Sequence, residues 1–277
     1  NLYSFSRVYS VFSFLLTIYL VIKKRPSFLF FKPLSAKKLK ETTINLGASF
    51  IKLAQVLATR ADFFSAEYLD ELKELHDQLP CMNKYEYEKV FNKAFKNNPF
   101  LLFENTPIAS ASIGQVHVAY LKNGEKVAVK LLRVGIKKRV KADIKIINFF
   151  NTIFKPLFSH YTKNSIEAVI SEFSSMILQE VSLSHELANL QKFSQTYKDS
   201  GIKFPKAFEE FCSDDALVMS YEEGFRFDDK ENLLKENIDF KEIISKLVDF
   251  YTTQMLINGY FHADPHPGNL LVNKQGE

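Results

Sequence analysis

The sequence predicts an α+β fold with two lobes, in which helices surround a small antiparallel sheet. Apolar residues recur at helical spacing over residues 36–79. Two runs rich in β-branched residues, 108–118 and 125–132, flank an Asn123-Gly124 turn and predict a β-hairpin. A strongly amphipathic segment at 238–258 stops at Gly259 and predicts a long helix in the second lobe.

Composition limits the size of the core and the kinds of partner. The chain has 277 residues, 46% of them hydrophobic, which suffices for one large domain or two modest ones. Its net charge of +4 is small and its basic residues are scattered, so no nucleic-acid partner is expected. Cys81 and Cys212 lack partners at metal-ligand spacing, which favours a reduced, cytosol-facing protein. The chain starts at Asn and ends at Glu277 beside a turn-like stretch, so we expect both ends to be cut.

Residues 1–35 form an apolar N-terminal segment. The run 8–22 is apolar and aromatic, and Lys23, Lys24 and Arg25 follow it. Such a helix would be about 22 Å long, short of the roughly 30 Å hydrocarbon core of a bilayer. It fits a helix on a membrane surface, a truncated signal-like segment, or a helix packed on the protein's own body. We favour peripheral contact with the cytoplasmic side of a membrane.

Residues 36–103 are expected to form a helical extension. One helix would include residues 51–60, where Lys52, Gln55 and Arg60 interrupt an apolar face. Lys52 and Gln55 are neighbours on one helical face, which a solvated surface alone would explain. Ser65 is a candidate N-cap for a second helix that Pro80 ends, and a third helix is expected in the stretch 84–103, ending near residues 97–99.

Residues 104–224 are expected to form the first lobe, with inserted helices. After the hairpin, helical patterns cover 139–158 and 165–193, and residues 211–221 predict a short strand pair. Residues 225–277 then begin the second lobe, where a strand at 270–272 follows the long helix.

The hairpin carries a candidate phosphate-binding loop. Residues 109–116, Ala-Ser-Ala-Ser-Ile-Gly-Gln-Val, keep the spacing of the kinase loop G-x-G-x-x-G-x-V, with Ala109 and Ala111 at two glycine positions. Alanine costs about 1 kcal/mol or more in left-handed conformations, so the loop should be stiffer than an ordinary one. Val127-Ala-Val-Lys130 then matches the strand whose lysine binds the α- and β-phosphates. A plain hairpin of small residues is the alternative interpretation. The nucleotide contacts expected here are Ala109, Ser110, Ala111, Ser112, Gly114, Val116 and Lys130.

Residues 262–269 have the spacing of a kinase catalytic loop, H-x-D-x-x-x-x-N. Asp264 would act as base or orient a nucleophile, and Asn269 would bind Mg²⁺. A proline-rich surface turn is the alternative, but it does not predict the upstream motifs. Residues 217–224 are typical of a kinase hinge and would place Met219 and Tyr221 beside adenine.

Lys130 needs a carboxylate partner, and the predicted helix over 165–193 offers Glu172, Glu180 and Glu186. Glu180 and Glu186 are six residues apart, about 240° of helical rotation, so they cannot share one face. We therefore expect them to have different partners.

Together these motifs resemble the UbiB (AarF) family of atypical protein-kinase-like proteins, which is linked to ubiquinone metabolism. The resemblance rests on residues 50–57 with Thr59 and Arg60, on 107–117, 127–130 and 261–271, and it covers nearly everything after residue 40. It implies a kinase-like two-lobe fold with an N-terminal helical extension. The roles it implies are Lys130 as the ATP-binding lysine, Glu186 as its ion-pair partner, Glu180 in the E-x-D motif, Lys52 and Gln55 in a K-x-G-Q motif that covers the site against bulky protein substrates, Asp264 as the catalytic-loop aspartate and Asn269 as a metal ligand.

The sequence departs from the family pattern at two positions. Ala54 replaces the K-x-G-Q glycine, and Ser182 replaces the E-x-D aspartate. A D-F-G metal ligand would follow Asn269 by roughly a dozen residues, so we expect the chain to be truncated before it.

The resemblance implies a protein that binds ATP and Mg²⁺ and acts as an ATPase or as a small-molecule or lipid kinase. It would support isoprenoid-quinone biosynthesis, with isoprenoid-quinone precursors or quinone-biosynthesis proteins as partners. Two alternatives remain: a nucleotide-binding pseudokinase scaffold, and an aminoglycoside/choline-type kinase, whose loop also carries a histidine where His266 stands.

Overall fold

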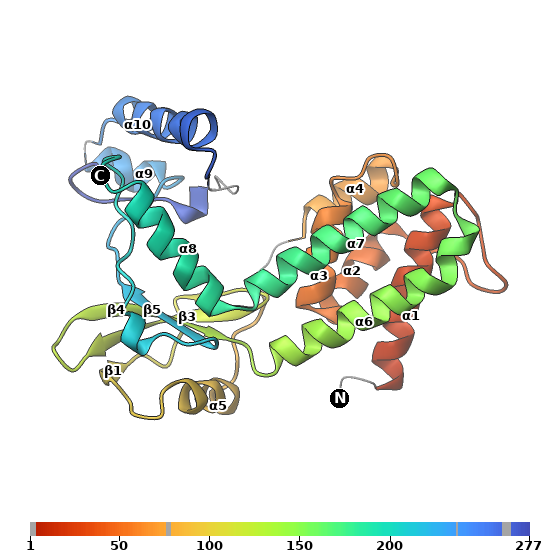
Figure 1. Ribbon diagram of the computed structural model, residues 1–277, viewed down its shortest axis with the longest axis horizontal. Helices are drawn as coiled ribbons and strands as arrows, with labels where there is room; N and C mark the ends of the chain where they lie inside the picture. Colours follow the sequence, from red (N-terminus) through yellow and green to blue (C-terminus); the bar gives the residue numbers. More distant parts are fainter. Residues whose placement is uncertain (1–3, 76–78, 237, 262–266) are drawn as a thin grey trace.

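The computed structural model describes residues 4–75, 79–236, 238–261 and 267–277. Figure 1 shows three groups of elements: a helical bundle, a small sheet and a C-terminal group of helices. Helix α8 (Leu183–Thr196) runs from the sheet toward the C-terminal group. The predicted α+β class is confirmed.

The bundle contains six α-helices from two parts of the chain. They are α1 (Phe5–Ile22), α2 (Ala36–Leu46), α3 (Ala48–Leu57), α4 (Ala66–Lys73), α6 (Ile136–Phe154) and α7 (His160–Glu180). The single helix expected before residue 60 is two helices, because Gly47 between them has φ of 88°. Phe14 of α1 and Phe50 of α3 are fully buried and meet edge to face, 5.3 Å between ring centroids.

Helix α1 confirms the apolar N-terminal helix. By length and composition it could cross a membrane, yet 44% of its 18 residues are buried inside the protein. Val11, Phe14, Leu16 and Leu20 pack in the bundle, so one face of α1 is packed on the protein's own body. Arg7 also pairs with the buried Asp143 of α6, at 2.7 Å between Nη2 and Oδ1.

The sheet is antiparallel, with strands in the order β1-β3-β4-β5 and β2 paired to β3. Its strands are β1 (Phe100–Phe103), β2 (Ala109–Ser110), β3 (Gly114–Leu121), β4 (Lys126–Leu132) and β5 (Ala216–Ser220). The predicted hairpin is β3-β4, and Gly124 takes the left-handed conformation that its turn requires, with φ of 86°. Helix α5 (Lys84–Ala94), capped by Asn83 and Glu86, covers one face.

The helix expected in the stretch 84–103, with its end near residues 97–99, is shorter than predicted. Helix α5 ends at Ala94, and residues 100–103 pair with β3 as strand β1. Phe91, Phe95, Phe100 and Phe103 form an aromatic cluster that packs on the apolar face of the sheet. Residues 84–103 therefore pack with the sheet, and the helical extension to which the sequence assigned them is shorter.

Two further predictions were wrong in detail. The helix expected over 165–193 is broken at Val181 and Ser182, so that α7 and α8 are separate helices. The strand pair expected over 211–221 is the single strand β5, preceded by a 3₁₀ turn at Glu209–Phe211. Strand β5 pairs with β4 along its length, and its local neighbours make isolated bridges to it, Ala207 to Met219 and Ser213 to Ala216.

The C-terminal group contains β6 (Phe225–Arg226), α9 (Lys230–Lys235), α10 (Phe240–Thr253) and β7 (Leu271–Val272). The predicted long helix is α10, which continues as a π-helical turn at Gln254–Asn258 and ends where Gly259 has φ of 63°. Strands β6 and β7 pair, and a Cβ on Gly224 would lie 2.9 Å from the carbonyl oxygen of Val272. Backbones approach so closely there that only glycine fits.

Candidate functional site

Lys130 lies on the face of the sheet opposite helix α5 and the aromatic cluster that packs beneath it. Val127, Val129 and Leu131 face that cluster, so alternation along β4 turns Lys130 to the other side. Val116 of β3 and Leu217 of β5 are its cross-strand partners. Directly opposed residues share a face, and the three therefore form one row.

Glu186 meets Lys130 on this face. The Lys130 ammonium lies 2.8 Å from Oε1 and 2.7 Å from Oε2 of Glu186, and the two side chains are 23% and 39% exposed. Glu186 lies in the first turn of α8, where the helix dipole stabilises a carboxylate. The pair is accessible from solvent and fixes the lysine, the arrangement that a phosphate-binding cation requires.

A second row beside Lys130 is apolar. Val118, Ala128 and Met219 are cross-strand partners on the same face. Val118 and Ala128 are buried and Met219 is half-buried. An apolar strip next to a cation suits a flat heterocycle linked to phosphates.

The loop between β2 and β3 is short and tightly held. Ala109 and Ser110 pair with Val116 and Gln115, and the amide of Ala111 donates to the carbonyl of Gly114 at 2.8 Å. A Cβ on Gly114 would lie 2.6 Å from the carbonyl oxygen of Leu131. The third glycine position of the loop therefore requires glycine for close strand packing.

Ser112 lies at the tip of this loop and is only 1% exposed. Among the described residues, its hydroxyl has no hydrogen-bond partner. A buried hydroxyl without a partner costs about 1–3 kcal/mol. Ser112 is thus a polar group whose hydrogen-bonding capacity is not used within the described part of the chain.

Arg133, which follows β4, anchors the loop and was not identified from the sequence. Its Nε donates to the carbonyl of Ala111 at 2.9 Å, and its Nη2 donates to Pro80 and to the Ser110 hydroxyl at 2.8 and 3.0 Å. Burial lowers the pKa of Arg133, but a guanidinium stays charged at neutral pH. The loop is therefore tied to the end of the helical extension.

Gln115 and His117 form a buried chain of hydrogen bonds behind the loop. The Met82 amide donates to Gln115 Oε1 at 2.8 Å. Gln115 Nε2 lies 2.7 Å from His117 Nε2, and His117 Nδ1 lies 2.8 Å from the carbonyl of Glu104. A neutral histidine that donates from Nδ1 satisfies every contact. Consistent with this tautomer, burial lowers the pKa of His117.

A cleft lies between the Lys130 face and the C-terminal helices. It encloses about 1260 Å³, including its open mouth. Residues from α8, β5, α10 and the 3₁₀ turn at Pro267–Asn269 line it, among them Glu186, Leu217, Met219, Phe250, Tyr251 and Asn269. The structure thus brings Glu186, Met219 and Asn269 to one space.

Other predicted residues do not line the cleft or lie outside the described residues. Lys130 and the loop residues 109–116 are not among the lining residues, although Lys130 contacts Glu186, which is one of them. The Tyr221 ring lies under the Lys126 ammonium, at 4.0 Å from the centroid, and Tyr221 is not among the residues that line the cleft. Asp264 and its neighbours 262–266 lie outside the described residues, so the role of Asp264 stays a prediction from its motif.

The residues present fit a magnesium ion held with a nucleotide. Across the described ranges, no group of three histidine, cysteine or carboxylate side chains is placed to hold a metal alone. Mg²⁺ at phosphoryl-transfer sites is bound by one or two protein groups together with phosphates and water. The amide oxygen of Asn269, which lines the cleft, is a suitable ligand of that kind.

Lys52 and Glu180 connect α3 to α7. Lys52 Nζ lies 3.1 Å from Glu180 Oε1, and Gln55 Nε2 donates to the carbonyl of Leu75 at 3.2 Å. Glu180 and Glu186 thus have different lysine partners. Of the described residues that line the cleft, none comes from α3. Lys52 and Gln55 instead hold the helical extension together.

The antiparallel sheet, the ion pair from Lys130 to Glu186 of α8, and a cleft between the sheet and a C-terminal helical group together define a protein-kinase-like fold. Residues 74–277 match the family model of the ABC1 atypical kinase-like domain. The chain belongs to this family.

Similar proteins come from bacteria and plants. A protein from the hydrogenase 1 5' region of Clostridium pasteurianum is 36% identical over 87% of this chain and 46% of its own length. A probable protein kinase UbiB of Shewanella loihica is 33% identical, covering 86% of this chain and 44% of its own length. The chloroplastic ACTIVITY OF BC1 COMPLEX KINASE 7 of Arabidopsis thaliana is 33% identical over 86% of this chain and 35% of its own length. The chain spans less than half the length of these relatives.

The fold is also found in a solved structure. The complex of Rv3197 with erythromycin from Mycobacterium tuberculosis aligns with a TM-score of 0.54 at 23% identity. The alignment covers 86% of this chain and 63% of that one. The predicted kinase-like fold is confirmed.

Proposed function

We propose that this domain binds Mg-ATP in the cleft and uses it for ATP hydrolysis or for phosphoryl transfer to a small molecule or lipid. The observation that carries the proposal is the two-oxygen contact between Lys130 and Glu186. A half-exposed ion pair contributes little to stability by itself. Its position between a phosphate-type loop and a cleft favours a role in binding an anion.

Each residue on the cleft face has a role in this proposal. Lys130 would neutralise the α- and β-phosphates, and Glu186 would hold its ammonium in place. The row of Val118, Ala128 and Met219 would pack against adenine. Asn269 would hold Mg²⁺, which neutralises charge on the transferred phosphoryl group, and Asp264 would orient the nucleophile.

The substrate we propose is an isoprenoid-quinone precursor at the cytoplasmic side of a membrane. Relatives bearing the name UbiB and the motifs that resemble the UbiB family support this assignment. The Lys52–Glu180 pair joins two helices of the bundle, α3 and α7.

ATP turnover by the full-length protein tests the proposal. We expect turnover that falls by at least about 100-fold, the usual size of an acid–base or orienting contribution, in Asp264→Asn. The matched control is Asp249→Asn, an exposed carboxylate on α10, which should leave turnover unchanged. Tight ATP binding without turnover would favour the pseudokinase scaffold instead, and phosphorylation of choline or an aminoglycoside would favour that class of kinase.

A further inference from the structure

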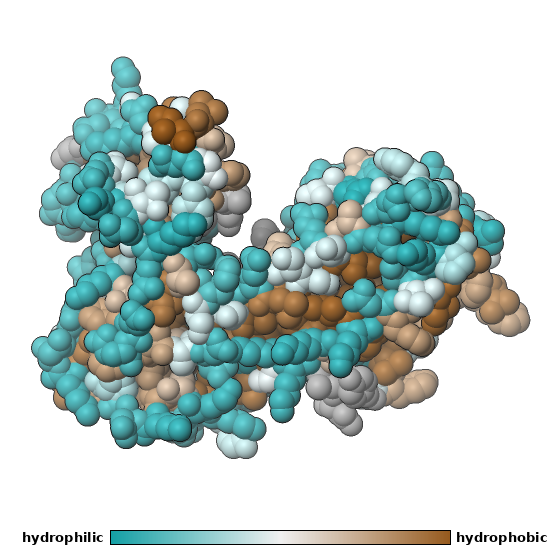
Figure 2. Space-filling model, in the orientation of Figure 1, coloured by the Kyte–Doolittle hydropathy of each residue, from teal (hydrophilic) through white to brown (hydrophobic). Residues whose placement is uncertain are grey.

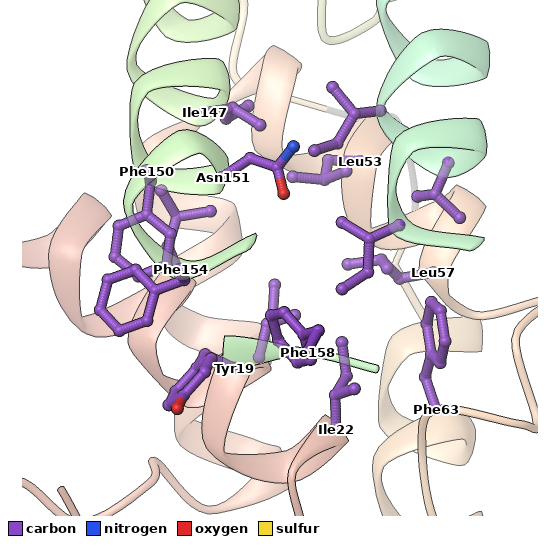
Figure 3. Close-up of a pocket in the computed structure, with 15 residues that line it drawn as sticks. Tyr19, Ile22, Leu53, Leu57, Phe63, Ile147, Phe150, Asn151, Phe154 and Phe158 are labelled. Atoms are coloured by element: carbon purple, nitrogen blue, oxygen red, sulfur yellow. The ribbon is translucent and has the colours of Figure 1, made fainter. Parts of the chain in front are cut away.

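Helix α8 carries Glu186 but buries little of its own surface. Of its 14 residues, all of which the structure describes, only Leu183 is buried. The two long helices of the bundle, α6 and α7, are packed differently: their apolar side chains face those of α1 and α3 (Figure 3), and an apolar band runs between them (Figure 2). In proteins a helix is held mostly by packing an apolar face. The position of α8, and of Glu186 with it, therefore depends on contacts at its ends.

The first turn of α8 is tied to the turn that leads into β5. The Ser184 hydroxyl donates to Asp214 Oδ1 at 2.6 Å. The carbonyl of the neighbouring Asp215 accepts from the Leu132 amide at the end of β4, at 3.1 Å, and β5 begins at the next residue. Asp214 is thus held by the same sheet that carries Lys130.

Two lysines fix this turn from other elements. Lys137, in the first turn of α6, donates to the Asp214 carbonyl at 2.8 Å, and its Nζ lies 3.3 Å from Asp214 Oδ2 and from Asp215 Oδ1. Lys93 of α5 pairs with the other carboxylate oxygen of Asp215. We refer to Ser184, Asp214, Asp215, Lys137 and Lys93 as the Asp214 cluster. It joins α5, α6 and α8 to one corner of the sheet.

Asp214 is ionised at neutral pH. The hydrogen bond from Ser184 and the ammonium of Lys137 hold the pKa of its carboxyl group below the ordinary value. Its side chain is 64% exposed, and an ion pair so open to solvent contributes little to the free energy of unfolding. We therefore expect the contact with Ser184 to affect the place of α8 much more than the folding of the chain.

Asp214 and Lys130 hold α8 from different sides. Ser184 and Glu186 are two residues apart, about 200° around the helix. Both contacts are short, 2.6 Å from Ser184 to Asp214 and 2.7 Å from Lys130 to Glu186. A shift of α8 by about 1 Å along the second contact would take it beyond hydrogen-bond distance. Releasing the first contact should therefore loosen the second.

We propose that Asp214 is a positioning residue: through Ser184 it fixes the first turn of α8 and so keeps Glu186 against Lys130. One consequence rests on the proposed function. If Lys130 binds the phosphates of ATP, losing the Asp214 carboxylate lowers nucleotide affinity although Asp214 does not touch the nucleotide. The order of α8 itself is measured with no nucleotide present.

Amide hydrogen exchange of the full-length protein, without nucleotide, tests the contact directly. In Asp214→Ala and in Ser184→Ala, exchange over residues 185–190 should become at least about threefold faster, because the first turn of α8 is released. Ser184→Thr keeps the hydroxyl and should behave like the wild type. Asp199→Ala is the matched control, since Asp199 is an exposed carboxylate beyond the C-terminal end of α8. Wild-type exchange in either alanine variant overturns the proposal.

Titration with Mg-ATP separates positioning from a general loss of structure. We expect the dissociation constant to rise at least about threefold in Asp214→Ala. The same change made in Glu186→Gln, where Lys130 has already lost its charged partner, should alter it by less than about 1.5-fold. A purely structural role would give the same fold-change in both backgrounds, and that result overturns the proposal. If the wild type does not bind Mg-ATP, the proposed function fails, and the exchange measurement alone decides the role of Asp214.

Discussion

Replacing Arg133 with glutamine should loosen the phosphate-type loop and destabilise the protein. Arg133 makes hydrogen bonds of 2.8–3.0 Å to Pro80, Ala111 and Ser110. A hydrogen bond from a charged donor contributes about 1.5–3 kcal/mol. Pro80 and Ala111 are exposed, so in the variant water can bind their carbonyls in place of the guanidinium. The contributions of the three hydrogen bonds to the free energy of unfolding therefore do not add in full. We expect a loss of about 2–3 kcal/mol in the free energy of unfolding.

Urea unfolding and limited proteolysis measure this change. Arg133→Gln should lower the unfolding midpoint and speed cleavage between residues 109 and 113. Arg139→Gln is the matched control, because Arg139 is exposed on α6 and surface changes stay within about 0.5 kcal/mol. Mg-ATP affinity of the full-length protein should fall in Arg133→Gln, because the loop is no longer held. A change in stability no larger than that of the control would refute the anchoring role.

Three further predictions concern buried groups. Asp143→Ala leaves Arg7 without its buried partner, and it should cost about 3–5 kcal/mol in urea unfolding; a cost below about 1 kcal/mol would contradict a structural role. Burial lowers the pKa of His117, so the unfolded state binds the extra proton first and stability should fall as pH drops below about 6.5. His117→Gln should flatten that dependence in thermal unfolding at several pH values. Gly114→Ala places a Cβ 2.6 Å from a backbone oxygen and should lower the melting temperature, unlike Ala111→Gly on the open side of the loop.

Local signals explain which elements the sequence predicted well. The Asn123-Gly124 turn requires left-handed backbone, so the β3-β4 hairpin follows from neighbouring residues. Strand β1 forms because Phe100 and Phe103 meet distant partners on β3 and α5. Helix propensity and periodicity do not contain that information.

In the candidate site too, local sequence signals predicted some features, and features that depend on long-range contacts were missed. The sequence identified Lys130 but offered three carboxylates as candidate partners. Glu186 reaches Lys130 because the chain breaks between α7 and α8, which the sequence did not predict. Arg133 was missed because it binds backbone carbonyls, one of them 53 residues away. Every residue type carries a backbone carbonyl, so the sequence does not show which residues accept these hydrogen bonds. The Asp214 cluster was missed for the related reason that its members come from elements far apart in the chain.

Titration of the full-length protein with Mg-ATP tests the central claim most directly. Lys130→Ala removes the cation that Glu186 holds beside the cleft, and Lys126→Ala, on the same strand but with its ammonium over the Tyr221 ring, is its control. We predict that the dissociation constant rises at least about tenfold, or about 1.4 kcal/mol, in Lys130→Ala and stays unchanged in Lys126→Ala. Equal ATP affinity in wild type and Lys130→Ala would contradict the assignment of this cleft as the nucleotide site.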